Sequence, residues 1–381
     1  MLMLRDVAVR GEALPSPSGR YYRPELDALR FLAFFMVFLG HAIPLKTTSS
    51  HLLEAIRETG ALGVPIFFML SSYLITELLT REKAATGALN VRAFYIRRIL
   101  RIWPLYFFAL LTGFAALHVL GGPTMSIAAL IAYVALVGNW FTVFNDFLPG
   151  GLSPLWSIGV EEQFYVFWPP LMRIANRKTM FIASITLWAI SQLAVLILCA
   201  AHASIRPVIW ANSFTHIQYF ALGSLISLTL NGSRLHLTKT RRIVMIGLGF
   251  ALLFSADFIF NAQLHAQQST IGRTYPGYLV TGIGAALIFL GVLDVPFPPL
   301  LKSTAWLGKI SYGLYVFHLP CVLLAIGFGN KALHLTTLHY LFSFLIGLPL
   351  TIAAAALSYR FLESPFLRIK DRFEIIKSRA T

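Results

Sequence analysis

The sequence predicts an all-α membrane protein, a polytopic helical bundle of about ten transmembrane helices. Two observations lead to this prediction: 57% of the residues are hydrophobic and only 12% are charged, and the mean hydropathy is +0.71. A chain of this composition cannot hide all its apolar residues in a water-soluble core, so many of them must face lipid.

Eleven apolar segments have about the length that a helix needs to cross a bilayer. They lie near residues 26–44, 61–79, 103–120, 126–144, 155–172, 180–201, 212–230, 243–260, 276–294, 306–328 and 338–360.

The basic residues test this count, because Lys and Arg collect in short cytoplasmic loops. They cluster at the N-terminus and at 81–101, 173–178, 234–242, 302–309 and 360–379. Two segments separate each pair of neighbouring clusters, except that three lie between 101 and 173. Because both clusters are expected in the cytoplasm, an even number of crossings must separate them, so one of those three segments does not cross the bilayer.

We expect the exception near 126–154, as a re-entrant or interfacial segment, because NDFLPGGLSP contains Gly and Pro breakers and no Lys or Arg. Ten crossings then leave both termini in the cytoplasm and place the protein in the cytoplasmic (inner) membrane. The expected parts are an N-terminal tail (1–24), a transmembrane domain (25–365) and a basic C-terminal tail (366–381).

The net charge of +15 is therefore explained by basic residues that set the orientation of the protein in the membrane. No nucleic acid is expected as a partner. The N-terminal tail lacks the apolar region and small-residue cleavage site of a signal peptide. The two cysteines, Cys199 and Cys321, lie in apolar runs without metal-ligand spacing. Neither a metal site nor redox chemistry is indicated.

Two ionisable residues bracket the first apolar run, FLAFFMVFLG. Arg30 and His41 are eleven residues apart, which places them within about 20° of each other around a helix and about 16 Å apart along it. Ionisable groups at membrane depth usually mark chemistry or transport. Arg30 would hold an anion and His41 would move a proton. In the alternative interpretation, Arg30 is an ordinary basic residue at the cytoplasmic end of the helix, and His41 only makes a contact with a neighbouring helix.

A second basic group lies in FYIRRILRIWPLYFF. Arg98 and Arg101 are spaced i and i+3 and project from one helical face, with Arg97 about a quarter turn away. The arginine fork pairs well with phosphate. With Arg30 they would form a cytoplasmic anion site, although plain positive-inside anchors would look the same.

Two carboxylates, Glu161 and Glu162, lie within the apolar segment WSIGVEEQFYVFWPPL. Adjacent helical residues point about 100° apart, so only one can easily face the same cavity as His41. One of them would orient His41 or an arginine. A structural salt bridge or a helix cap is the alternative.

Taken together, these motifs resemble the acyltransferase 3 family of integral membrane O-acyltransferases. The matching strings are RPELDALRFLAFFMVFLGHA, GVPIFFMLSSYLIT, RRILRIWPLY, LWSIGVEEQFYVFWPPL, LGKISYGLYVFHLP and ALSYRFLESPF. They follow in the family's order over residues 22–366. Members of this family have about ten crossings, in agreement with the charge pattern.

The sequence departs from the family pattern at two positions. The family often has Asp where this chain has Pro65, and Gly where it has Ser72. An acid partner for His41 is then expected from Glu161 or Glu162. We expect a stand-alone member, without a fused hydrolase-like domain.

The resemblance implies an enzyme that transfers an acyl group, commonly acetyl, from cytoplasmic acyl-CoA to a hydroxyl of a cell-surface carbohydrate or related acceptor. Acyl-CoA would be a co-substrate, and no tightly bound cofactor is expected. Arg30, Arg98 and Arg101 would bind the donor, while His41 would be catalytic with Glu161 or Glu162. His318 in YVFHLP is a weaker candidate, which a structural hydrogen bond would also explain.

A transporter or flippase for a glycan or an acylated intermediate is the rival hypothesis, with His41 in a proton path. Two observations weigh against it: no paired broken helices are obvious, and an arginine pair on the cytoplasmic side suits a coenzyme A donor better. A membrane scaffold would leave the intramembrane ionisable groups unexplained.

Overall fold

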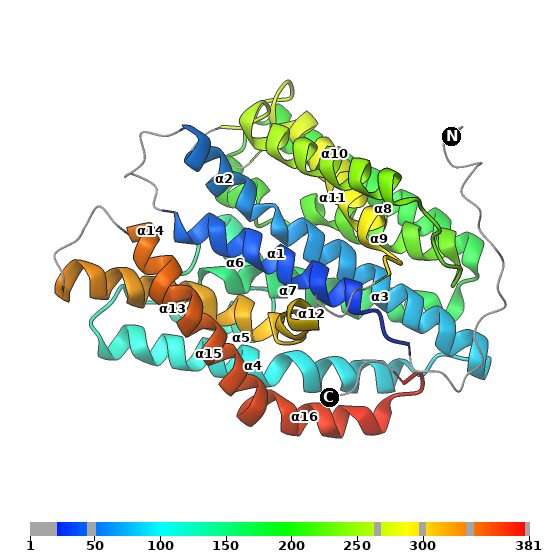
Figure 1. Ribbon diagram of the computed structural model, residues 1–381, viewed down its shortest axis with the longest axis horizontal. Coiled ribbons are helices and arrows are strands. Elements are labelled where there is room, and N and C mark those ends of the chain that lie inside the picture. The colour runs from blue at the N-terminus through cyan, green and yellow to red at the C-terminus, as the bar shows by residue number, and fades with distance from the viewer. Residues whose placement is uncertain (1–20, 44–50, 263–267, 297–301, 333–338, 378–381) are drawn as a thin grey trace.

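The computed structural model describes residues 21–43, 51–262, 268–296, 302–332 and 339–377 (Figure 1). Within these ranges the chain is helical and forms no β-strand, apart from one isolated bridge between Ser204 and Gln268. The all-α prediction is confirmed. Most of the predicted N-terminal tail and the last four residues of the predicted C-terminal tail lie outside the described residues.

The helices overlap the predicted apolar segments, except that those at 51–61 and 364–370 lie almost entirely outside them and one segment is broken into short pieces, as described below. They are α1 (Pro24–Ala42), α2 (His51–Ala61), α3 (Gly63–Thr86), α4 (Val91–Val119), α5 (Ile127–Val134), α6 (Gly138–Phe144), α7 (Trp156–Ile174), α8 (Arg177–Ala200), α9 (Ser213–Leu230), α10 (Lys239–Phe258), α11 (Thr274–Val292), α12 (Lys302–Lys309), α13 (Ser311–Ala332), α14 (His339–Phe342), α15 (Leu348–Ser358) and α16 (Ser364–Lys370). Short 3₁₀ or π turns join some of them: η2 (Gly150–Leu155), η3 (Ile205–Ile209), η5 (Ser343–Gly347), η6 (Tyr359–Glu363) and η7 (Asp371–Phe373).

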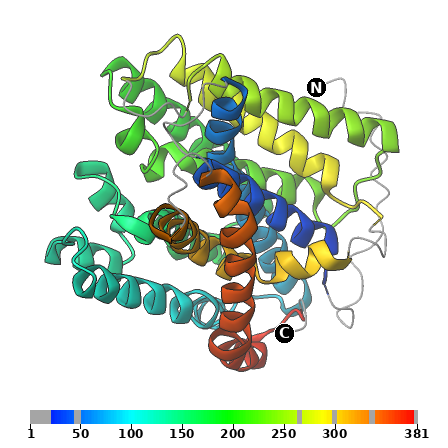
Figure 2. The ribbon, with the colours of Figure 1, turned by 60° about the vertical axis from the view of Figure 1, so that its left-hand side comes forward.

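Helix α1 lies in the middle of the bundle. It packs against α2, α3, α12 and α13. The helices α8 to α11 form one side of the bundle, and α4, α13, α15 and α16 lie on the other side (Figures 1 and 2). A residue of α1 can therefore take part in sites built by helices from both halves of the sequence.

Glycines allow the close packing around α1. A Cβ on Gly60 of α2 would stand 2.5 Å from the carbonyl oxygen of Met36, and one on Gly308 of α12 would stand 1.8 Å from that of Asp27. Any side chain at either position would overlap the α1 backbone. These contacts hold both ends of the helix that carries Arg30 and His41.

Among the described residues, six helical stretches are long and apolar enough to cross a membrane: Leu53–Thr86, Val91–Val119, Arg177–Ala200, Thr274–Val292, Ser311–Asn330 and Ser343–Phe373. They indicate a multi-pass membrane protein, but the predicted count of about ten crossings is not confirmed. Helices α1 and α7 are not among the six. Each carries three charged residues, namely Glu25, Asp27 and Arg30 in α1 and Glu161, Glu162 and Arg173 in α7.

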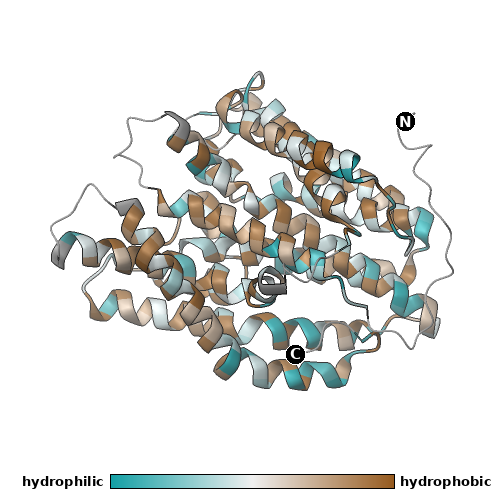
Figure 3. Ribbon diagram, in the orientation of Figure 1, coloured by the Kyte–Doolittle hydropathy of each residue, from teal (hydrophilic) through white to brown (hydrophobic). Residues whose placement is uncertain are grey.

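The long helices consist largely of hydrophobic residues, as Figure 3 shows by colour, and many of these side chains are exposed. On α8, Ile182, Leu193 and Ile197 are each more than half exposed. Contiguous apolar surface of this kind is rare on soluble monomers and is what lipid covers in a membrane protein.

The segment predicted to be re-entrant or interfacial is broken into short pieces. Residues 126–155 contain α5, α6 and η2, of eight, seven and six residues. A helix of eight residues spans only about 12 Å, far less than the hydrocarbon core of about 30 Å. No helix in this region is long enough to cross the bilayer on its own, and the re-entrant or interfacial placement stays a prediction.

Candidate active site

Three neighbouring pockets run through the bundle around α1, α3, α4, α7 and α13. We call them the arginine pocket, the middle pocket and the histidine pocket. Their volumes are about 130, 110 and 510 Å³, respectively. The first two share Arg30, Ser71, Arg98 and Arg101, and the last two share Val64 and Tyr315. The pockets are therefore arranged in series.

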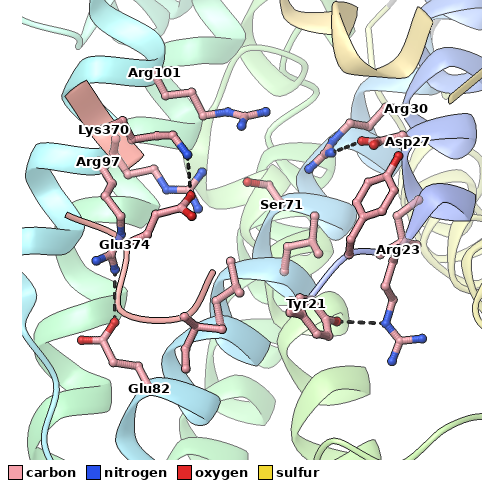
Figure 4. Close-up of a pocket in the computed structure, with 16 residues that line it drawn as sticks. Tyr21, Arg23, Asp27, Arg30, Ser71, Glu82, Arg97, Arg101, Lys370 and Glu374 are labelled. Atoms are coloured by element: carbon pink, nitrogen blue, oxygen red, sulfur yellow. Dashed lines mark hydrogen bonds and ion pairs between the residues drawn. The ribbon is translucent and has the colours of Figure 1, made fainter. Parts of the chain in front are cut away.

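The arginine pocket is strongly cationic. Six Lys or Arg and three Asp or Glu side chains line it, which gives an excess of three positive charges. Figure 4 shows Arg101 of α4 and Arg30 of α1 extending toward each other, with Ser71 of α3 between them. The charged lining residues are Arg23, Asp27, Arg30, Glu82, Arg97, Arg98, Arg101, Lys370 and Glu374.

Helix geometry explains the arginines of α4. Arg98 and Arg101 line both the arginine pocket and the middle pocket, because residues spaced i and i+3 share a face. Arg97 lines the arginine pocket but not the middle pocket. It bonds Glu82 at 3.2 Å and donates to the carbonyl of Phe373 at 2.7 Å. Arg97 thus fastens α4 to α3 and to the C-terminal segment.

Neighbouring groups hold the other arginines in the pocket wall. Arg30 donates to Asp27 at 2.6 Å, one turn earlier in α1. The guanidinium carbon of Arg98 stands 5.1 Å from the ring centre of Tyr165, within the range of a cation–π contact. Both side chains are preorganised before any anion binds.

The middle pocket joins the arginines to hydroxyl groups. Ser71 and Tyr165 share a hydrogen bond of 2.6 Å, and the Tyr165 hydroxyl also donates to Glu161. Tyr312 lines this pocket and donates to the carbonyl of Ile102 at 2.9 Å. The pocket offers polar groups along a passage that also has apolar walls.

The two adjacent glutamates have different surroundings. Glu161 lines the middle pocket. Glu162 is buried and accepts a hydrogen bond of 3.3 Å from the indole of Trp103. The structure therefore separates them, as expected for neighbours on one helix. Glu161 lies with the arginines in the middle pocket, whereas His41 lines the histidine pocket.

His41 contacts another histidine. Its Nδ1 lies 2.9 Å from the carbonyl oxygen of Val37 and 3.3 Å from Nε2 of His318 in α13. The sequence makes His318 a weaker candidate than His41, because a helix-buried histidine has many structural explanations. Its place in the YVFHLP motif was the available signal, but the sequence did not indicate which residue it would meet.

The histidine pocket combines indole rings with balanced charge. Trp156 and Trp210 line it together with Arg57, Arg206, Glu58 and Asp146. These two cations and two anions cancel. The sequence did not indicate this group of indole and charged side chains. Its members come from α2, α7 and the segments around 146 and 206–210, which only the fold brings together.

Tyr315 forms part of the wall between the middle and histidine pockets. Its hydroxyl shares a 2.7 Å hydrogen bond with Ser157 and donates to the carbonyl of Pro154 at 3.2 Å. Ser72, the neighbour of Ser71, is buried and bonds the carbonyl of Met69. Tyr315 is therefore a candidate for substrate contact, while Ser72 has a local structural role.

Residues 23–360 match the acyltransferase domain that defines the acyltransferase 3 family. The chain belongs to this family. The match confirms the resemblance read from the motifs. It includes every residue of the middle and histidine pockets and most of the arginine pocket. No solved structure matches this acyltransferase 3 chain.

Curated relatives of this acyltransferase 3 chain are named O-acetyltransferases. It is 27% identical over 372 residues to "O-acetyltransferase OatA" of Staphylococcus aureus, which covers 90% of this chain and 57% of that protein. It is 25% identical over 370 residues to "Peptidoglycan O-acetyltransferase OatA" of Listeria monocytogenes, which covers 91% and 56%, respectively. The chain thus spans little more than half the length of these relatives.

Proposed function

We propose that this protein is a membrane O-acyltransferase that moves an acyl group, most simply acetyl, from acyl-CoA to a hydroxyl of a cell-surface carbohydrate. One observation carries the proposal. In a chain of the acyltransferase 3 family, a cationic pocket and a histidine-lined pocket lie at the two ends of a series that passes through the bundle. Family membership favours this activity over a transporter or flippase.

The arginine pocket suits the phosphate groups of a coenzyme A donor. Phosphates bind best to planar, permanently charged guanidinium groups, and the excess of three positive charges remains after the acidic residues are counted. Arg30, Arg98 and Arg101 are the proposed donor-binding residues. The positive-inside pattern supports a cytoplasmic opening for this pocket.

The middle pocket suits the thioester end of the donor. It starts at the shared arginines and ends at Tyr315, next to the histidine pocket. When bound, acyl-CoA supplies an activated carbonyl carbon. The hydroxyls of Tyr165, Tyr312 and Tyr315 are polar groups that can orient the thioester along this passage.

His41 is the proposed general base. It accepts the proton of the acceptor hydroxyl while that oxygen bonds to the acyl carbon and the carbon–sulfur bond breaks. It then returns the proton to the leaving sulfur, so that the products are the ester and free coenzyme A thiol. Imidazole suits both steps, because it gains and loses a proton near neutral pH.

The histidine pocket suits a carbohydrate acceptor. Sugars carry many hydroxyls on an uncharged ring, and the pocket combines indole side chains with paired charged groups whose total charge is zero. Its volume of about 510 Å³ is the largest of the three. One relative is named a peptidoglycan O-acetyltransferase, which supports a glycan of the cell envelope as the acceptor class.

The test is acyl transfer by the purified protein in proteoliposomes. Acetyl-CoA labelled in the acetyl group is supplied with peptidoglycan fragments or membrane glycan, and both free thiol and label in the glycan are measured. We expect both signals from the wild type and neither from His41→Ala. Equal label in the glycan from His41→Ala would contradict the role of His41. Glycan carried across the vesicle membrane without label would support transport instead.

A further inference from the structure

Two histidines that are 277 residues apart in sequence meet at the histidine pocket. Their ring centres are 4.9 Å apart and the rings cross at 68°. His318 is completely buried, while His41 is partly exposed and lines the pocket. The buried ring therefore stands behind the one that can reach a substrate.

Backbone carbonyls fix the proton positions in both rings. A carbonyl oxygen only accepts hydrogen bonds, so Nδ1 of His41, 2.9 Å from the Val37 oxygen, carries a proton. Nδ1 of His318 carries one for the same reason, because it lies 2.6 Å from the Tyr315 oxygen. In neutral rings, both Nε2 atoms then have a lone pair.

The contact between the rings agrees with this assignment. The Nδ1 proton of His41 is shared between two acceptors, the Val37 oxygen at 2.9 Å and, in a longer contact of 3.3 Å, the Nε2 lone pair of His318. A second proton on His318 Nε2 would place two N–H groups against each other. His41 therefore donates to the backbone of α1 and to His318, and His318 donates to the backbone of α13.

We propose that His318 is a positioning residue for acyl transfer. As the second acceptor of the Nδ1 proton, it helps the Val37 carbonyl to hold His41 in the tautomer whose Nε2 is basic, and its lone pair stabilises the imidazolium that forms when His41 takes a proton. The proton of the acceptor hydroxyl moves to Nε2 of His41, while the Nδ1 proton stays in place and His318 gains none. This inference rests on the proposed function of His41.

The surroundings of His318 favour this role over simple packing. A buried imidazole loses hydration that a leucine in the same place would not lose. His318 packs edge to face with Phe34, with 6.2 Å between ring centres, so its buried surroundings include an apolar ring. The carbonyl that fixes His318 belongs to Tyr315, whose side chain separates the middle and histidine pockets. The same short segment of α13 therefore contains both His318, which contacts His41, and Tyr315, which lies between the two pockets.

Two amide variants test the proposal, because each replaces a different ring nitrogen. The amide of His318→Gln can reach the position of Nε2 and accept the His41 proton. The amide of His318→Asn is shorter and reaches only the position of Nδ1. The turnover number (kcat) and the KM for acetyl-CoA are measured for both, with His318→Leu, His41→Ala and the exposed-site control His118→Leu.

We expect kcat to fall roughly 10- to 100-fold in His318→Asn and His318→Leu, with the KM for acetyl-CoA unchanged, since a general base contributes about 10²- to 10⁴-fold and the variants only misplace it. His318→Gln should recover most of this loss. His118→Leu should match the wild type.

Three outcomes would overturn the proposal. One is wild-type kcat in His318→Leu, and another is equal loss in the Gln and Asn variants. The third is loss of activity in parallel with loss of thermal stability in all three variants, which would indicate packing. If His41→Ala itself keeps activity, the proposed function of His41 fails, and this result is distinct from the other three.

Discussion

The arginine pocket and the histidine pocket lie in one bundle but differ in charge and lining. The arginine pocket has an excess of three positive charges, set by side chains of α1, α3, α4 and the C-terminal segment. The histidine pocket is larger, its charged residues cancel, and it contains two indole side chains. Only one of the two is built to attract an anion.

Under the proposed function, this difference would divide a two-substrate reaction in space. The charged donor would bind where the positive charge is concentrated, and the uncharged acceptor would meet His41 in the pocket whose charges cancel. Val64 and Tyr315, which line both the middle and the histidine pocket, lie between the two regions. Variants on either side should therefore change different kinetic constants.

The largest effect should come from His41→Ala. We expect kcat to fall about 10²- to 10⁴-fold, which is the usual contribution of a general base. The affinity for acetyl-CoA, measured by equilibrium binding to the purified protein, should stay unchanged. Loss of donor binding in this variant would contradict the division between the two pockets. His118→Ala, at an exposed position of α4, is the control.

The next effect should come from Arg98→Gln and Arg101→Gln. Removing a charge-assisted hydrogen bond to phosphate costs about 1.5–3 kcal/mol, which raises the KM for acetyl-CoA roughly 10- to 100-fold. The KM for the glycan acceptor should change little. Arg241→Gln, at an exposed position of α10, is the matched control. A larger effect on the acceptor than on the donor would reverse the assignment of the pockets.

The smallest effect separates the two glutamates. Glu161→Gln should lower kcat about threefold to tenfold, because it removes the anion that accepts from Tyr165 beside the arginines. Glu162→Gln keeps an oxygen that can accept from Trp103 and should change kcat less than about twofold. Turnover measured for both at saturating substrate checks the order. The reverse order would make Glu162 the functional carboxylate.

Local helix geometry explains two relative placements that the sequence predicted. The pairing of Arg98 with Arg101 on one face follows from the i, i+3 spacing, and both do line the same two pockets. The separation of Glu161 from Glu162 follows from the 100° step between neighbours. These results need only the chain near each residue. The roles of these residues in donor binding and catalysis stay predictions.

The partner of His41 required the tertiary structure. The sequence favoured a glutamate, because the chain has Pro65 where the family often has Asp. The structure instead places His318 against His41 and Glu161 among the arginines. The contact joins α1 to α13, and no local spacing can specify a meeting between helices so far apart in sequence.

The sequence by itself determined the class of this protein, because composition sets the solvent and a periodicity of 3.6 residues sets the faces of each helix. Its ordered motifs indicated the acyltransferase 3 family, which the family match confirmed. Only the tertiary structure decided which faces meet. The placement of Arg30, Tyr315 and His41 along a series of pockets depends on the packing of α1 against α3 and α13. Such packing is set by side-chain shape and glycine contacts across the whole bundle, and no single segment contains that information.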